Sequence, residues 1–112
     1  MPGVAQPNVV DVVGHDASGR YLMIMVEARA WGAEAAQASQ LKEKINAYAG
    51  FIMDGSLARQ YPETAGQPVD IQLDCCEAPR GEFATILKHA AMQLQRLGIG
   101  LRVNVTAMHP AR

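Results

Sequence analysis

The sequence predicts an α+β fold, a two-layer sandwich in which two helices cover one face of a four-stranded mixed sheet. Three observations lead to this prediction. Four short stretches have the composition or alternation of strands, two longer ones have apolar residues at helical spacing, and their order is ββαβαβ. The third and fourth strands each have one polar side. Both helices are therefore expected on the same face of the sheet, with the other face open.

The first two strands are expected to form a β-hairpin. NVVDVVG (8–14) is a β-branched run, DASG (16–19) favours a turn, and RYLMIMVEA (20–28) is a second extended run. PVDIQLDC (68–75) and IGLRVNV (99–105) alternate apolar and polar residues and are the third and fourth strands. Because parallel crossovers are right-handed, two helices on one face restrict the strand order to 1-2-3-4 or 2-1-3-4.

Two amphipathic helices are expected between these strands. The first, within 33–54, has a narrow apolar stripe formed by Leu41, Ile45, Tyr48 and Ile52. Gly55 follows it and is suited to the left-handed conformation that ends a helix. The second helix follows Pro79 and ends at Gly98, and its apolar residues are Phe83, Ile86, Leu87, Ala90, Leu94 and Leu97.

Length and composition indicate a single domain. The chain has 112 residues, enough for one hydrophobic core, and 49% of them are hydrophobic. We expect the folded domain at 8–106. Flexible tails are expected at 1–7 and 107–112, because both ends contain proline and lack an apolar period.

The charge pattern disfavours nucleic acid and membranes as partners. Ten Lys and Arg residues stand against eleven Asp and Glu residues, with no basic run that would bind phosphates. The longest apolar run, 21–26, is far shorter than the roughly 20 residues of a spanning helix. The first residues lack the pattern of a secretory signal, so the cytoplasm is the expected location.

Little in the sequence indicates catalysis. Cys75 and Cys76 are adjacent and are expected to be free thiols, although their place between a strand and a helix leaves a thiol-dependent enzyme or regulator as an alternative. None of the three histidines has metal-ligand spacing with the cysteines, so no metal site is predicted. No cofactor is expected, and a non-enzymatic protein is favoured.

The second strand is apolar on both sides, and this is the main functional indication. One side, with Tyr21, Met23 and Met25, is expected on the open face of the sheet together with Val9 and Val13. A large exposed apolar patch usually marks a contact surface, and methionine suits adaptable surfaces. We therefore expect self-association through this face, as a homodimer. The alternatives are a tail folded across the patch, another protein, or a small ligand.

The chain also resembles a bacterial family of small proteins of unknown function. The family pattern is close to LQEKLNxYLxFIESG followed by a YPxAxG turn, and this chain has LKEKINAYAGFIMDGSL (41–57) and YPETAG (61–66). The matching residues are Lys44, Asn46, Tyr48, Phe51, Ile52, Gly55, Tyr61, Pro62 and Gly66. Ala30 departs from the pattern, because an acidic residue precedes the tryptophan in the family.

The resemblance supports the fold and implies no activity. If the family shares a site, the candidate ligand pocket lies around Trp31, Asn46, Tyr48 and Tyr61, because an amide and two phenols among apolar neighbours need hydrogen-bond partners. The alternative is that Asn46 faces solvent and the aromatic residues pack the helix end onto the sheet.

Overall fold

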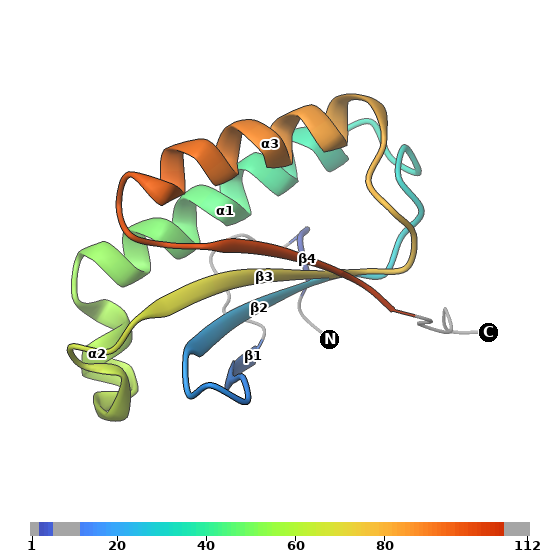
Figure 1. The fold of residues 1–112 in the computed structure, drawn as a ribbon. Helices are drawn as coiled ribbons and strands as arrows, with labels where there is room; N and C mark the ends of the chain where they lie inside the picture. The colour runs from blue at the N-terminus through green and yellow to red at the C-terminus, as the bar shows by residue number, and fades with distance from the viewer. Residues whose placement is uncertain (1–2, 6–11, 107–112) are drawn as a thin grey trace.

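The structure is a computed structural model that describes residues 3–5 and 12–106. Figure 1 shows two layers, with α1 (Gln37–Met53) and α3 (Gly81–Gln95) side by side over one face of a sheet. The strands are β1 (Val12–His15), β2 (Tyr21–Glu27), β3 (Val69–Cys75) and β4 (Leu101–Val105). The predicted ββαβαβ arrangement is confirmed.

The sheet has the strand order β1-β2-β3-β4. β1 is antiparallel to β2, whereas β2, β3 and β4 are parallel, so the sheet is mixed. Of the two predicted orders, 1-2-3-4 is therefore the one found. Each helix carries the chain from one parallel strand to the next, which places both helices on the same face.

The connection from α1 to β3 contains two short helices. Gly55 has a φ of 83°, in the left-handed region, and separates α1 from α2 (Ser56–Gln60) as its position predicted. A 3₁₀ helix, η1 (Pro62–Thr64), starts at the proline of the YPETAG turn. The chain then enters β3.

The two methionines of β2 face the helices and lie in the core. Met23 pairs with Ile71 and Met25 with Leu73, and all four side chains are 0% exposed. The expectation that Met23 and Met25 stand on the open face is therefore wrong. Because β2 is apolar on both sides, its own pattern does not fix which side faces the helices. Its parallel register with β3 fixes this orientation. The polar side of β3 must face away from the helices, and it consists of Asp70, Gln72 and Asp74.

The other residues expected on the open face do not lie there in the described part of the chain. Val13 pairs with Met23 and Tyr21 pairs with Val69, so both lie on the helix side of the sheet, partly buried against the core. Val9 lies outside the described residues. None of the four described residues of the predicted surface forms an exposed patch on the open face.

The described part of the N-terminus joins the core. Val4 is 1% exposed, and its N–H donates to the carbonyl of Val26 at 3.1 Å. In the described part of the chain, the pairs of β1 with β2 run to Val12 and Ile24, and Val4 bonds β2 two residues further along. The buried Lys44 of α1 donates from Nζ to the carbonyl of Gly3 at 2.7 Å. Residues 3–5 are therefore docked, and the rest of the tail expected at 1–7 lies outside the described residues.

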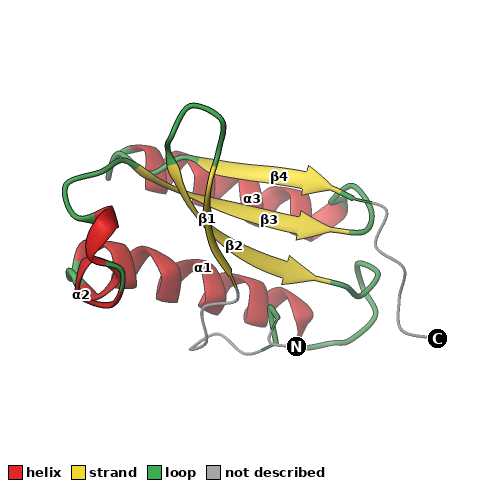
Figure 2. Ribbon diagram, turned by 90° about the horizontal axis from the view of Figure 1, so that it is seen from below, coloured by secondary structure: helices red, strands yellow, loops and turns green. Residues whose placement is uncertain are grey.

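The hairpin crosses the open face. Figure 2 looks onto this face and shows β1 running across the sheet toward the turn. Arg102 of β4 bonds Asp16 of that turn at 2.6 Å, which places the turn over the far side of the sheet. Leu22 points to the open face and is nevertheless buried. The hairpin thus supplies part of the cover that the apolar second side of β2 requires.

Candidate functional site

A network of two aspartates and two arginines fastens the hairpin to the sheet. Asp70 of β3 accepts two hydrogen bonds from Arg20, from Nε at 2.9 Å and Nη2 at 2.7 Å. Arg102 Nη2 bonds both Asp70 at 3.0 Å and Asp16 at 2.6 Å. The backbone N–H of Gly100 donates to Asp70 at 2.9 Å. These bonds join the turn, β3 and β4.

Both aspartates of this network are held in the charged form. The Arg20 guanidinium, with help from Gly100 and Arg102, lowers the pKa of the Asp70 carboxyl to about 2 although burial opposes the shift. Hydrogen bonds from Ser18 and Arg102 lower the pKa of Asp16. All oxygens of these carboxylates are engaged with their own chain, so the network is suited to fixing the hairpin and not to acid or base catalysis.

The four residues of the predicted ligand pocket do not come together. Trp31 is buried against Phe83, with ring centroids 4.8 Å apart, and its indole N–H donates to the carbonyl of Glu77 at 2.8 Å. Tyr48 of α1 is buried between the helix and the sheet, and its hydroxyl donates to the carbonyl of Ile24. Tyr61 lies after α2, and Asn46 is exposed on α1. The alternative, in which the aromatics pack and Asn46 faces solvent, describes this arrangement.

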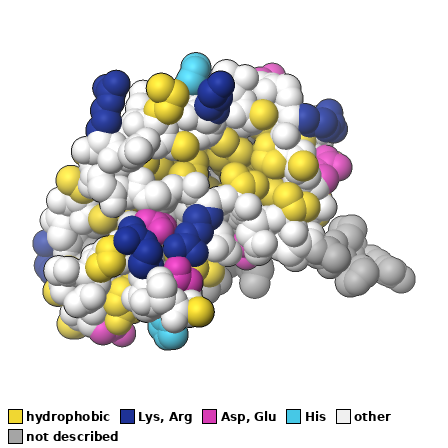
Figure 3. Space-filling view, viewed as in Figure 1, with side chains coloured by type: hydrophobic (Ala, Val, Ile, Leu, Met, Phe, Trp, Pro, Cys, Tyr) yellow, Lys and Arg dark blue, Asp and Glu magenta, His cyan; other side chains and the backbone are white. Residues whose placement is uncertain are grey.

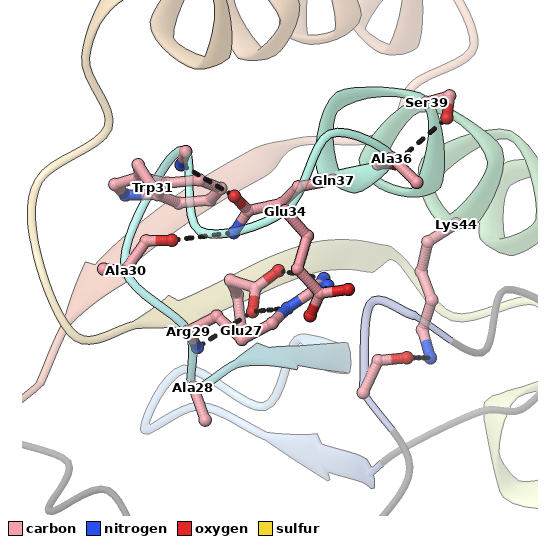
Figure 4. A network of polar contacts seen from close by, with 12 residues as sticks. Glu27, Ala28, Arg29, Ala30, Trp31, Glu34, Ala36, Gln37, Ser39 and Lys44 are labelled. Atoms are coloured by element: carbon pink, nitrogen blue, oxygen red, sulfur yellow. Dashed lines mark hydrogen bonds and ion pairs between the residues drawn. The ribbon is translucent and has the colours of Figure 1, made fainter.

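Polar side chains missed by the sequence reasoning organise the loop between β2 and α1, as Figure 4 shows. Buried Glu27 accepts hydrogen bonds from Arg29 Nε at 2.8 Å and Nη2 at 2.7 Å, and Arg29 also reaches Glu34 at 3.1 Å. Gln37 accepts from the N–H of Gly32 at 2.7 Å and donates to the carbonyl of Ala30. The available signal was Glu27, a carboxylate in an apolar strand, which needs a buried partner.

The cysteines lack the surroundings of reactive thiols. Cys75 is fully buried, and burial raises the pKa of its thiol to about 11. It is therefore protonated at neutral pH and shielded from substrates. The Cys76 thiol, half-buried, donates to the carbonyls of Ala28 and Arg29 at 3.7 and 3.6 Å. Within the described residues, no cluster of His, Cys, Asp and Glu is arranged to hold a metal ion.

A groove of about 500 Å³ runs between α1 and α3 on the outer surface of the helix layer. Its floor is apolar and consists of Ile45, Ile86 and Ala90. Its rim is polar and consists of Lys42, Asn46, Glu82, Thr85, His89 and Gln93. Asn46 is the one predicted pocket residue that lines this groove.

The edge strand β4 presents apolar side chains to solvent. Val103 and Val105 are on the helix side of the sheet but are 42% and 51% exposed. Ala91 of α3 lines a hollow with Leu101, and Ala84 lies two turns earlier on the same side of the helix. Figure 3 shows a band of apolar atoms between α3 and β4.

The backbone of β4 is also open along one side. Gly100 accepts from the N–H of Ile71, and the N–H of Thr106 donates to Cys75, both at 2.8 Å. Since neighbouring residues in a strand point their N–H and C=O groups in opposite directions, 102 and 104 also face β3. Residues 101, 103 and 105 point outward, and among the described residues no strand pairs with that side.

Fold and surface together define a small two-layer α+β domain whose edge strand β4 is apolar and exposed. The chain belongs to DUF6572, a family of unknown function, whose family model matches residues 2–107. This confirms the resemblance to a family of unknown function. No curated protein and no solved structure matches the chain. Within residues 3–5 and 12–106, no helix has the length and apolar character needed to cross a bilayer.

Proposed function

We propose that this chain is a non-enzymatic, cytoplasmic interaction domain that self-associates through the β4 side of its sheet. The contact surface consists of the outward backbone groups of β4 and the exposed side chains of Val103 and Val105. It replaces the surface expected around Met23 and Met25, which are buried. The free, apolar edge is the observation that carries the proposal.

The contrast between the two edges of the sheet supports this choice. Proteins usually protect edge strands with proline, lysine, bulges or covering segments, because an open edge pairs with other chains. At the other end of the sheet, the edge strand β1 spans four residues in the described part of the chain, and Val4 bonds β2 beyond it. β4 contains neither proline nor lysine, and its one charged residue, Arg102, is turned to the open face and bonded there.

The state of the polar side chains supports a non-enzymatic function. The carboxylates of Asp16 and Asp70 are bonded to arginines of their own chain, and the buried thiol of Cys75 is protonated. A thiol-dependent activity would therefore depend on Cys76, whose thiol is directed at backbone carbonyls.

Light scattering tests the proposal. The wild-type chain is expected to have twice the mass of one chain at micromolar concentrations, and Val103→Glu to be monomeric with unchanged helical circular dichroism. Met92→Glu is the matched control, because Met92 is 56% exposed on α3, away from the edge. It is expected to remain dimeric. A monomeric wild-type chain would overturn the proposal.

A second candidate function is the binding of a small ligand in the groove between α1 and α3. Its volume lies within the usual range of ligand sites, and its rim residues Asn46, His89 and Gln93 have no hydrogen-bond partner among the described residues. A thermal-shift screen of small molecules tests this function. Hits that lose their effect in His89→Ala would support it, and an empty screen at millimolar ligand would count against it.

A further inference from the structure

We infer that the partner at the β4 edge is a second copy of this chain, whose β4 pairs antiparallel about a two-fold axis at Val103. The two four-stranded sheets then join into one continuous sheet. This inference rests on the proposed function and specifies its geometry. Three features of β4 support this register: the direction of its backbone groups, the charge on its open face, and its apolar side.

The backbone of β4 is complementary to itself in this register. In an antiparallel ladder, two opposed residues whose N–H and C=O groups face each other exchange both hydrogen bonds. With the axis at Val103, each Val103 bonds its symmetry mate, and Leu101 faces Val105 of the second copy. The outward groups of β4 belong to 101, 103 and 105, so every one of them obtains a partner.

Charge distinguishes this register from its neighbours. Arg102 and Asn104 lie on the open face, and an axis at Val103 sets each arginine opposite the second copy's Asn104. An axis at Arg102 would oppose two arginines directly, which destabilises a strand pair. An axis at Asn104 would carry Leu101 beyond the paired strand.

The apolar side chains also fit together. Leu101, Val103 and Val105 all point to the helix side. Antiparallel pairing places the two copies of Val103 next to each other and each Leu101 next to a Val105. β-Branched residues form favourable cross-strand pairs. The two exposed valines of each chain are thus covered by those of the other.

Disulfide cross-linking tests the register. Opposed residues of a hydrogen-bonded pair have Cα atoms about 5.5 Å apart, within the range for a disulfide. In a Cys76→Ser background, which removes the half-buried native thiol, Val103→Cys is expected to give a covalent dimer on mild oxidation. Val105→Cys is the matched control on the same edge. Its symmetry mate would be four residues away along the strand, about 13 Å, so it should not cross-link alone.

Mixing two different cysteine variants extends this cross-linking test. Chains with Leu101→Cys and chains with Val105→Cys are expected to cross-link with each other and not with themselves. Covalent dimers of the Val105→Cys variant by itself would overturn this register, and so would the absence of covalent dimers of Val103→Cys. If the wild-type chain still had a dimeric mass, the proposed self-association would remain supported. A monomeric wild-type chain would overturn both.

Amide hydrogen exchange gives a measurement that needs no substitution. The N–H groups of Arg102 and Asn104 face β3 and are expected to exchange slowly at any concentration. Those of Leu101, Val103 and Val105 face outward and should exchange slowly only at concentrations where the dimer forms. Fast exchange of these three amides in a dimeric sample would overturn the inference.

Discussion

Asp70 is a nearly buried carboxylate whose oxygens accept hydrogen bonds from four nitrogen atoms, two of Arg20, one of Arg102 and the N–H of Gly100. Each donor comes from a different part of the chain: the turn, β4, and the loop before β4. A buried charge is stable only when its hydrogen bonds are made, so Asp70 requires these three parts to meet above β3.

The Asp70 carboxylate makes stability depend on pH. In the unfolded chain it takes up a proton near its ordinary pKa of 3.8, but in the folded chain only near 2. Its contribution is therefore complete above about pH 4 and is lost as the pH falls toward 2. The free energy of unfolding, measured in urea, should fall more steeply in this window for the wild type than for Asp70→Asn.

At neutral pH, Asp70→Asn is expected to lower the free energy of unfolding by about 1–3 kcal/mol, because two arginines lose a charged acceptor. Asp74→Asn is the matched control on the same side of β3, since its partners are the neutral amides of Gln72 and Asn104. It should have a smaller effect. Equal losses in the two variants would contradict the role given to Asp70.

Gly100 leaves space for the carboxylate of Asp70. A Cβ at this position would lie 2.8 Å from Asp70 Oδ1, inside contact distance, and would disturb the hydrogen bond from the Gly100 N–H. We expect Gly100→Ala to lower the free energy of unfolding by about 1–3 kcal/mol in urea denaturation. Gly50→Ala, in α1 with nothing near its Cβ, should raise it by about 0.5–1 kcal/mol. An unchanged Gly100→Ala variant would contradict this reading.

Among the elements, the segment 3–5 behaves as a continuation of the sheet edge. Val4 bonds the carbonyl of Val26 in β2, and Lys44 of α1 donates to the carbonyl of Gly3 from the helix layer. This short segment, with one buried apolar side chain, thus lies along β2. The β4 edge has no such cover among the described residues.

Truncation of Val4 tests this role. Val4→Ala removes two buried methyl groups and is expected to lower the free energy of unfolding by about 1–3 kcal/mol, as measured in urea. Ala5→Ser changes the exposed neighbour and should have little effect. A Val4→Ala variant as stable as the wild type would show that the segment does not dock.

For the whole molecule, the proposed pairing of β4 about a two-fold axis is a closed contact, because each copy uses the same strand, so it joins two copies. Association through such a closed two-fold contact stabilises the folded chain by mass action. The midpoint of thermal unfolding should therefore rise with concentration for the wild type and stay constant for Val103→Glu, as calorimetry at two concentrations would measure. A constant wild-type midpoint would contradict dimerisation.

Most of the fold was predictable because its elements have clear local signatures. The alternation of β3 and β4, the apolar stripe of α1 and the position of Gly55 indicated the elements and their boundaries. The candidate site was less predictable. The exposure of Val103 depends on how α3 packs beside β4, and spacing along the chain does not give that packing.

By itself, the sequence determined the two-layer class and the mixed sheet, because the alternation of polar and apolar residues and the helical spacing are properties of neighbouring positions. Only the tertiary structure decided which side of β2 is inside and that the valines of the β4 edge are exposed. Both sides of that strand are apolar, so its own sequence pattern favours neither of the two orientations. The register with β3 breaks that equality, because it pairs residues far apart in the chain.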